Sequence, residues 1–378
     1  MFMKKKIIFI IIFFFLVCSV FGVYYYITSK KEEKIVENNN EIVEEPEEIV
    51  EEEPVIRRLS IVMVGDALIH GAVYLDAKKS DGSYDFSPMF KMIEPIIKDY
   101  DLKYYNQESI IGGGKPTHYP LLNSPKAIGE DLVAIGFNLV SLANNHAFDK
   151  GENAIRNSNK FWKKQEGVIT AGTYSSKQER DTIPVYEQND IKFSFLSYTV
   201  RTNGFKASKG NEYLVNVYSK EQAKKDITAA KDKGAEVIIV AMHWGNEYTH
   251  KPTKQQKEIA KYLSDLGVHL IIGTHPHVIQ PIGYVNDTLV VYSLGNFISA
   301  QKVLGLEKII GLLVGVEIVV DEESNVTFEN LESQLLYTYY NSKNKNFKIY
   351  PFDKLTDSIL KNHDKIEQEY LKIVNSEV

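Results

Sequence analysis

The sequence predicts an α/β fold, in which helices cover both faces of a β-sheet. From Leu59 onward, strand-length apolar runs alternate with amphipathic helical patterns. The apolar runs are continuous rather than alternating with polar residues, which is typical of strands buried on both faces. Polar bursts, most of them containing histidine, follow several of these runs. The predicted strands are Leu59–Val64, Leu102–Tyr105, Asn138–Leu142, Phe193–Tyr198, Glu236–Met242, His269–Ile272 and Thr288–Leu294.

Helical patterns with an apolar stripe lie between several of the strands. A terminal hairpin is predicted from Ile310–Val320 and Val326–Leu331, joined by an Asp-Glu-Glu-Ser-Asn turn. We expect the body of the protein to span residues 55–340. Residues 341–378 form a polar C-terminal extension with a helical pattern from Lys354 to Val374. The predicted helices of the body are Ser87–Lys98, Ser124–Ile135, Gly151–Gln165, Lys220–Lys233 and Lys254–Leu266.

The N-terminus, residues 1–28, predicts a membrane anchor. Three lysines at positions 4–6 precede an apolar run from Ile7 to about Ile27, and roughly 20 apolar residues suffice to cross a bilayer as a helix. A cleaved signal peptide is the alternative, but no A-x-A-like site follows the run. The lysines favour a single-pass protein of the cell membrane with a cytoplasmic N-terminus and an extracellular body. Cys18 is the only cysteine, and the residues before it do not favour a lipoprotein.

Residues 29–54 predict a disordered acidic stalk. Eleven glutamates and one lysine lie between residues 32 and 53, and few residues there could form a core. Of the formal net charge of −6, the part from Pro54 onward carries only −1. A nearly neutral body without a basic stripe argues against nucleic acid as a partner.

The polar bursts place potential metal ligands at the ends of predicted strands. In α/β sheets, ligands gather just beyond the carboxyl ends of strands, so we expect these side chains to converge. The bursts contain Asp66 and His70 after the first strand, Asn106 and Glu108 after the second, Asn144, Asn145 and His146 after the third, His243 and Glu247 after the run at 236–242, and His275 and His277 after the run at 269–272.

Carboxylate, amide and imidazole ligands together suit Mn, Fe or Zn, and no thiolate biases the site towards softer metals. A two-metal site needs a bridging carboxylate. Glu108 is the natural bridge, because it follows what we expect to be a central strand. Two further residues are candidates around the pocket: Trp244 as a wall, and Asn296 for orienting an imidazole or binding substrate.

Each burst has a purely structural alternative. A Gly-Asp pair after a strand is often only a turn. Asn144 or Asn145 could cap the next helix. His243 could be a hydrogen-bonded core histidine, and Glu108 could pair with a surface lysine. His275-Pro276-His277 has little structural use, and coincidence of all the bursts at strand ends favours a metal site.

As an ordered set, these motifs resemble those of the CapA family, also called PgsA, of capsule and poly-γ-glutamate synthesis proteins. That family is similar to the calcineurin-like metallophosphoesterases. The resemblance therefore implies a layered α-β-β-α metallophosphatase-like sandwich. The motifs lie between residue 59 and about residue 300. They are Gly65-Asp66-x-x-x-His70, Asn106-x-Glu108, Asn144-Asn145-His146-x-x-Asp149, His243-Trp244-Gly245-x-Glu247, Gly273-x-His275-Pro276-His277 and Ser293-x-Gly295-Asn296-Phe297.

The resemblance implies roles for individual residues. Asp66, His70 and His277 would hold a first divalent metal, and Asn145, His243 and His275 a second. Glu108 would bridge the two, and His146 would act as general acid or transition-state stabiliser. Two features depart from the superfamily pattern: three residues rather than one separate Asp66 from His70, and the bridge is Glu rather than Asp.

Three hypotheses for function follow. The resemblance implies a role in making, exporting or anchoring an anionic polymer of γ-linked glutamate, with other capsule-synthesis membrane proteins as partners. The chain could be a metal-dependent enzyme that hydrolyses or transfers a bond in that polymer. It could instead be a non-catalytic binding or export component whose metal site is structural or vestigial. The third hypothesis is a metallophosphoesterase acting on a small exported phosphate ester.

Overall fold

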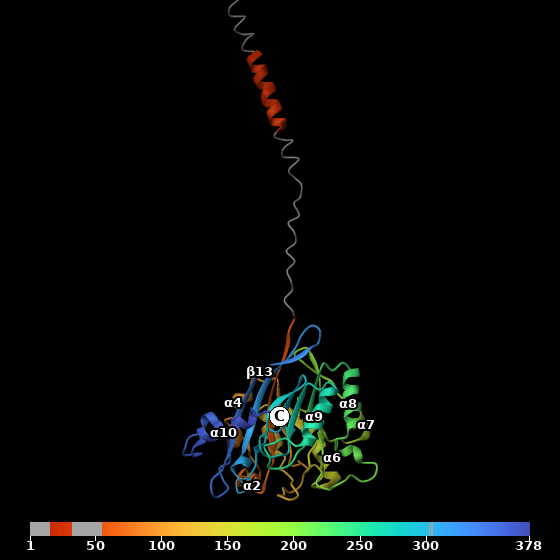
Figure 1. The fold of residues 1–378 in the computed structure, drawn as a ribbon, viewed down its shortest axis with the longest axis vertical. Coiled ribbons are helices and arrows are strands. Elements are labelled where there is room, and N and C mark those ends of the chain that lie inside the picture. The colour runs from red at the N-terminus through yellow and green to blue at the C-terminus, as the bar shows by residue number, and fades with distance from the viewer. Residues whose placement is uncertain (1–15, 32–54, 302, 304) are drawn as a thin grey trace, which may run out of the picture. The chain divides into compact units, whose positions relative to one another are not determined.

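The computed structural model describes residues 16–31, 55–301, 303 and 305–378. The chain divides into two units, Met1–Glu53 and Pro54–Val378. The second unit is the α/β body, whose strands and helices are drawn in Figure 1.

The predicted single-pass membrane localisation is wrong for the part of the chain that the structure describes. Among the described residues, no helix is long and apolar enough to cross a membrane. The predicted single-pass topology, with a cytoplasmic N-terminus and an extracellular body, therefore has no support in the structure. Residues 1–15 of the predicted anchor, and residues 32–54 of the predicted stalk, lie outside the described residues.

The body contains two sheets rather than one. The first sheet has eight strands, and its central strand β1 pairs in parallel with β2 and antiparallel to β12. A short strand, β11, also pairs in parallel with the end of β1. The order along the sheet is β14 (Lys348–Pro351), β13 (Val326–Tyr339), β12 (Ile310–Val320), β1 (Arg57–Ala67), β2 (Leu102–Asn106), β3 (Leu139–Ser141) and β4 (Ile169–Ala171), with β11 (Asn296–Ile298) beside β1.

The second sheet has six strands, and β6, β7, β8 and β10 run parallel to one another. Its edge strands β5 and β9 are antiparallel to their neighbours. The order is β5 (Tyr186–Gln188), β6 (Ile191–Thr199), β7 (Val237–His243), β8 (Leu270–Thr274), β10 (Thr288–Val291) and β9 (Ile282–Val285).

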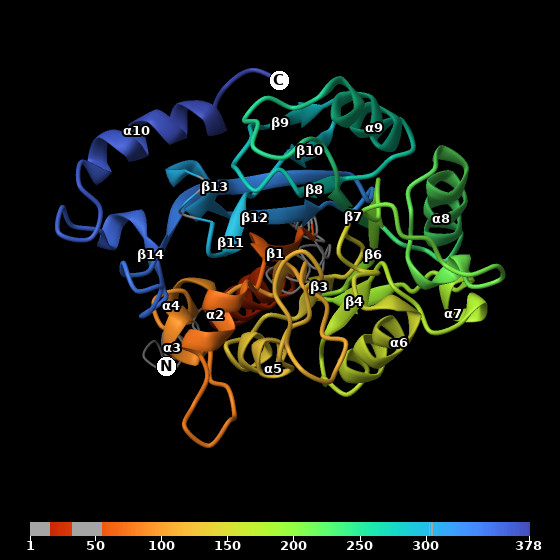
Figure 2. The same cartoon turned by 90° about the horizontal axis from the view of Figure 1, so that it is seen from below.

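Helices cover the outer faces of the two sheets (Figure 2). One group lies against the first sheet, and α8 and α9 lie against the second. The C-terminal helix α10 contacts β13. The first group is α2 (Gly71–Asp76), α3 (Ser87–Phe90), α4 (Glu94–Ile97), α5 (Ala127–Ala134) and α6 (Gly151–Trp162), and the others are α7 (Lys177–Asp181), α8 (Lys220–Asp232), α9 (Lys254–Asp265) and α10 (His363–Val374), with 3-10 turns at Glu212–Leu214, Leu306–Ile309 and Phe352–Lys354.

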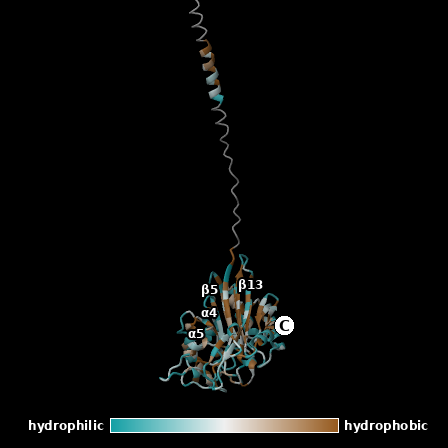
Figure 3. Ribbon diagram, turned by 90° about the vertical axis from the view of Figure 1, so that its left-hand side faces the viewer, coloured by the Kyte–Doolittle hydropathy of each residue, from teal (hydrophilic) through white to brown (hydrophobic). Residues whose placement is uncertain are grey.

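The alternation of side chains along β7 shows how the layers pack. Ile239 and Ala241 belong to the main core, which includes residues of both sheets. Val240 and Met242, on the other face of the strand, pack with residues of α8 and α9. Both faces are apolar because both are buried, which explains the unbroken apolar runs and the hydrophobic strands in Figure 3. The α/β prediction is confirmed, with the layers arranged as α-β-β-α.

One predicted helix is divided in two. The sequence pattern predicted a single helix over Ser87–Lys98, whereas the structure has α3 and α4 with a turn between them. Pro95 lies in the first turn of α4. A proline there lacks the N–H of a continuing helix and restricts the residue before it, so it starts a new helix.

Gly65 allows β11 to approach β1. A Cβ at this position would lie 1.9 Å from the backbone oxygen of Gly295, which accepts a hydrogen bond from the Asp66 amide at 3.0 Å. The same contact sets Asp66 beside Asn296 in the β1–β11 register. A side chain at residue 65 would therefore separate two strands that carry site residues.

We predict that Gly65→Ala lowers the free energy of unfolding by about 3 kcal/mol, because the clash is with backbone that cannot turn aside. Urea unfolding followed by circular dichroism measures this. Gly283→Ala is the matched control, since a Cβ there meets only the Val378 side chain at 3.3 Å. Equal stability of the two variants would contradict the prediction.

Candidate metal centre

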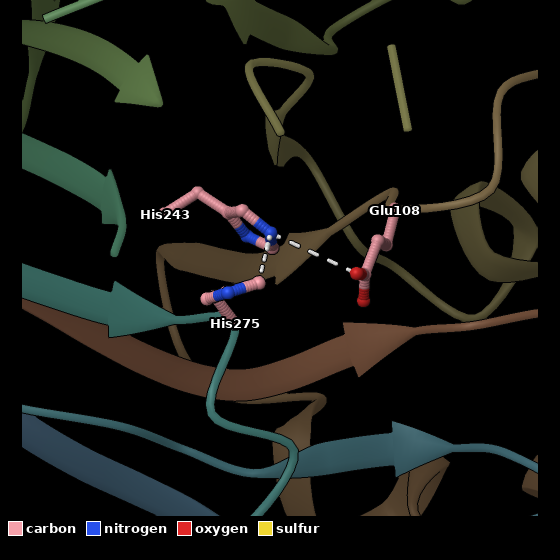
Figure 4. Close-up of side chains that lie close together, drawn as sticks. All are labelled: Glu108, His243 and His275. Carbon is pink, nitrogen blue, oxygen red and sulfur yellow. Dashed lines mark hydrogen bonds and ion pairs between the residues drawn. The ribbon is translucent and has the colours of Figure 1, made fainter. Parts of the chain in front are cut away.

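Side chains from both sheets converge where the strands end. Asp66 lies at the end of β1, and Glu108 lies two residues beyond β2. His243 is the last residue of β7, and His275 directly follows β8. Figure 4 shows Glu108, His243 and His275 pointing towards one another from separate segments. The convergence expected from the strand-end rule is what the structure displays.

Glu108 lies at the middle of this cluster. Its side chain is fully buried, and neither carboxylate oxygen has a hydrogen-bond partner. Its Oε1 lies 3.7 Å from His243 Nε2 and 3.7 Å from His277 Nε2. Burial raises the pKa of Glu108 well above its usual value, and the charge of Asp66 adds to this effect. A buried carboxylate without donors is a group that a cation would satisfy.

On one side of Glu108 lie Asp66 and His277. Asp66 Oδ2 is 3.3 Å from His277 Nδ1 and accepts the His275 backbone N–H at 3.2 Å. Asp66 Oδ1 accepts a hydrogen bond of 2.7 Å from Asn106 Nδ2. Asn296 Oδ1 lies 3.0 Å from His277 Nδ1, as expected for a residue that orients an imidazole.

On the other side of Glu108 lie His243, His275 and Asn145. His243 Nε2 is 2.8 Å from Asn145 Oδ1 and 3.1 Å from His275 Nδ1. His243 Nδ1 is 3.0 Å from the Thr274 hydroxyl, which fixes the ring. Burial lowers the pKa of both His243 and His275 well below the usual value, so both imidazoles are neutral and able to bind a cation.

The backbone after β8 is held in an unusual conformation. His275 has φ +96° and His277 has φ +57°, values that side-chain-bearing residues seldom adopt. Between them, the carbonyl oxygen of Pro276 accepts a hydrogen bond of 2.8 Å from the backbone N–H of Tyr248. Such strain persists where the surrounding structure enforces it, and it commonly marks functional sites. Here it directs two imidazoles, separated by one proline, into one cluster.

The residues present fit divalent cations. Three groups of side chains each offer ligand atoms within 4.8 Å of one another among the described residues. Two of the groups share Glu108, and two share His275. The groups are Asp66, Glu108 and His277; Glu108, His243 and His275; and Glu247, His275 and His277. Glu247 is exposed, whereas the other members are buried.

His146 lies beside the cluster and has a partner of its own. Its Nδ1 is 2.7 Å from Asp149 Oδ2, and that oxygen also accepts the Leu122 backbone N–H at 2.7 Å. Asn144 accepts the His146 backbone N–H at 3.0 Å. A carboxylate can only accept, so Nδ1 carries the proton and Nε2 is left for another partner. This assembly orients an imidazole as a catalytic site does.

His70 does not belong to any of the metal-binding groups. It lies at the start of α2, with Nδ1 3.1 Å from the Leu68 carbonyl and 3.3 Å from the Ala300 amide nitrogen. Burial lowers the pKa of His70 to about 4, and the charge of His277 adds to the effect. The extra residues between Asp66 and His70 thus place this imidazole against backbone at the edge of the centre.

Trp244 lies away from the centre, although it follows His243 directly. The indole packs in the outer core of the second sheet, stacked on Tyr292, and its Nε1 donates to the Tyr292 carbonyl at 3.0 Å. Successive residues at a strand end point to opposite faces, so His243 and Trp244 cannot both face the site.

Three residues around the centre were not found from the sequence. Arg201 donates from Nη2 to the Gly245 carbonyl at 2.6 Å, and Asn203 Oδ1 accepts from Asn145 Nδ2 at 3.2 Å. Both follow β6, so the strand-end rule applied to every strand would have found them. The ring centroid of Tyr248 lies 6.1 Å from that of His277. The backbone of Tyr248 has a φ of +64°, a conformation that the sequence did not predict.

The layers and the strand-end centre define a mixed α/β protein of metallophosphatase-like fold. The NAD nucleotidase NadN of Haemophilus influenzae has a similar fold, with a TM-score of 0.50 and 13% identity over 85% of this chain and 57% of that chain.

Residues 60–301 match the family described as bacterial capsule synthesis protein PGA_cap, and the chain belongs to this family. It is 30% identical over 247 residues to the PGA biosynthesis protein CapA of Bacillus subtilis, covering 64% of each chain. It is 28% identical over 254 residues to the capsule biosynthesis protein CapA of Bacillus anthracis, covering 65% of this chain and 60% of that one. The chain thus spans less than two thirds of these relatives. The predicted resemblance to the CapA family is confirmed.

We predict that Glu108→Gln removes divalent metal binding while leaving the fold intact, because it replaces the charged oxygen shared by two ligand groups. Free metal at 100 times its Kd should stabilise the wild-type chain by about 2.7 kcal/mol, and the variant should show no such gain. Elemental analysis and thermal unfolding measure the two effects. His118→Gln, an exposed histidine, is the control. Metal retained by Glu108→Gln would contradict the prediction.

The metal-free chain should become less stable between pH 6.5 and pH 9. Burial alone would lower the pKa of His277, but the charges of Glu108 and Asp66 outweigh burial and raise it to about 9. In the unfolded chain the imidazole titrates near 6.5, so its stabilising contribution is complete below that pH and is lost as the pH rises through 9.

Urea unfolding of chelator-treated protein at several pH values measures this loss. Metal-saturated protein is the control, because cations bind deprotonated imidazole more tightly as the pH rises. A free energy of unfolding that is constant from pH 6.5 to pH 9 in the metal-free chain would refute the assignment.

Proposed function

We propose that this protein is a divalent-metal-dependent hydrolase or transferase that acts on an anionic capsule polymer during its biosynthesis. The polymer that we propose is poly-γ-glutamate, in keeping with the resemblance of the motifs to the CapA family and with the name of the Bacillus subtilis relative, PGA biosynthesis protein CapA. Other capsule-synthesis proteins are its proposed partners.

The single observation that carries the proposal is the environment of Glu108. A fully buried carboxylate with no donor, placed 3.7 Å from two imidazole nitrogens, has no structural purpose by itself. Burying a carboxylate that no hydrogen-bond donor satisfies is unfavourable, and the imidazolium of His277, 3.7 Å away, compensates it only in part. The arrangement becomes favourable once cations lie between the carboxylate and the imidazoles, so Glu108 argues for metal binding over a purely structural role.

We infer two ions, sharing Glu108. Asp66 and His277 would complete one ligand set, and His243 and His275, with the Asn145 amide oxygen, would complete the other. The ligands are oxygen and nitrogen atoms, which suits Mn, Fe or Zn. When bound, such ions supply Lewis acidity and lower the pKa of a water molecule.

His146 is the proposed general acid. Asp149 holds one proton on Nδ1 and fixes the plane of the ring, so Nε2 is the nitrogen that would take up a second proton and give it to a leaving amine or alcohol. A binding component would have no need of a second oriented imidazole beside its metal ligands, and this pair therefore favours catalysis over binding alone.

The test is hydrolysis by the full-length, metal-loaded chain. Poly-γ-glutamate and a generic phosphate ester are the two substrates, with release of amine or phosphate as the readouts. We predict that His146→Gln lowers kcat by about 10²–10⁴-fold while bound metal is unchanged, because it removes a proton donor and no ligand. Asp149→Asn should lower kcat as well.

The matched control is His363→Gln. His363 also pairs with a carboxylate, that of Asp357 at 3.2 Å, but it belongs to α10. Unchanged kcat in this control is expected. Cleavage of the phosphate ester alone would redirect the assignment to a phosphoesterase. No cleavage of either substrate by wild-type protein that holds its metal would overturn the catalytic proposal and leave the binding component.

A further inference from the structure

The segment after β6 brings a cation to the rim of the centre. β6 and β7 are parallel neighbours with Thr199 opposite His243, so the residues after β6 emerge beside the residues after β7. The Val200 N–H donates to the His243 carbonyl at 3.1 Å. The Thr199 hydroxyl then donates to the Arg201 carbonyl at 2.8 Å. The backbone of Arg201 is therefore fixed next to a proposed metal ligand.

Within the part of the chain that the structure describes, the side chain of Arg201 is held at one nitrogen only. Its Nη2 donates to the Gly245 carbonyl at 2.6 Å, in the loop that follows His243. Two residues further on, Asn203 accepts a hydrogen bond from Asn145, whose own Oδ1 lies 2.8 Å from His243 Nε2. The segment thus contacts the His243 half of the centre at two points.

Arg201 has no acidic partner among the residues that the structure describes. In contrast, Arg57, Arg58 and Arg180 each contact a glutamate or aspartate. Arg201 is exposed, yet one hydrogen bond holds it, which leaves the remaining N–H groups of its guanidinium for a ligand. A planar guanidinium with free N–H groups matches carboxylate and phosphate oxygens.

We propose that Arg201 binds an anionic group of the substrate, a carboxylate or a phosphate, beside the His243 half of the metal centre. The inference rests on the proposed function, because it takes the centre to be where substrate binds. The inference adds a chemical class to the proposed function: the substrate carries an oxyanion next to the bond that reacts.

The test is oxyanion binding by the full-length, metal-loaded chain, measured by calorimetry. Two probes distinguish the sources of the oxyanion: inorganic phosphate, and the dipeptide γ-glutamyl-glutamate. We expect Arg201→Gln to raise the Kd of at least one probe by about tenfold or more, the effect of losing a charge-assisted pair. Arg201→Lys keeps the positive charge but loses the planar guanidinium with its paired N–H donors, so it should raise the Kd by a smaller factor. Whichever probe responds identifies phosphate or carboxylate as the group bound.

Lys206→Gln is the matched control, since it removes the same charge from the same exposed segment. It should change neither Kd by more than about twofold, because an exposed charge without a defined partner contributes little. Equal effects of Lys206→Gln and Arg201→Gln would overturn the proposal in favour of a general electrostatic field. So would unchanged Kd values in Arg201→Gln, or a wild-type chain that binds neither probe.

Bound metal is counted in every variant by elemental analysis. Loss of metal from both Arg201 variants would assign Arg201 a structural role through Gly245 and overturn the proposal. A wild-type chain that binds no metal would instead overturn the proposed function, and the effect of Arg201→Gln on probe binding would still be measured on its own. The two failures are therefore distinguishable.

Discussion

The burial of Glu108 is the constraint on which the rest of the centre depends. A carboxylate with no donor is unfavourable in an apolar interior, and the surrounding groups only partly compensate for it. On one side, burial keeps His243 and His275 neutral by lowering their pKa values, and on the other side the charges of Glu108 and Asp66 raise the pKa of His277 against the effect of its burial. A protein that needed only stability would place an apolar residue here, since replacing buried charge by packed apolar groups is often stabilising. The retained charge points to a cation.

The two sheets deliver the ligands because backbone can approach backbone at glycine. Gly65 lets β11 lie against β1. Gly273 lets β8 lie close to the backbone at Tyr292, because a Cβ on residue 273 would stand 2.0 Å from the Tyr292 carbonyl oxygen. These contacts bring Asn296 next to Asp66, and they hold the strand that ends before His275. The geometry of the centre is thus a property of close strand packing, and the ligand side chains only complete it.

The strand-end rule predicted the convergence of the site from sequence, because it depends only on strand direction and on residue type. The rule placed Asp66, Glu108 and His243 in one cluster, although it uses no interatomic distances. It failed for Trp244 because it ignores which face a side chain takes. Arg201 was overlooked because the segment after β6 contains neither a histidine nor a carboxylate that would suggest a metal ligand.

Other errors have different physical origins. Continuous apolar runs do not reveal how many sheets share a core, so the second sheet could be expected only from the family resemblance. The anchor was predicted from apolar length in the sequence, whereas no described helix has the length that a bilayer needs. A sequence pattern does not determine how many ligands a metal has. His70, for example, occupies its position in the motif, but its Nδ1 lies against the Leu68 carbonyl.

The electrostatics of the centre restrict what it can bind. Asp66, Glu108 and Asp149 are buried carboxyl groups, and Glu247 adds an exposed one at the rim. An anionic polymer approaching such a cluster would be repelled, unless cations reverse the local sign. Divalent ions between Glu108 and the imidazoles would do so inside the centre, where the low dielectric makes their field strong. Arg201 would do so at the rim, where substrate arrives. An acidic polymer and this acidic cluster are therefore compatible only through those cations, which ties the proposed substrate class to metal loading.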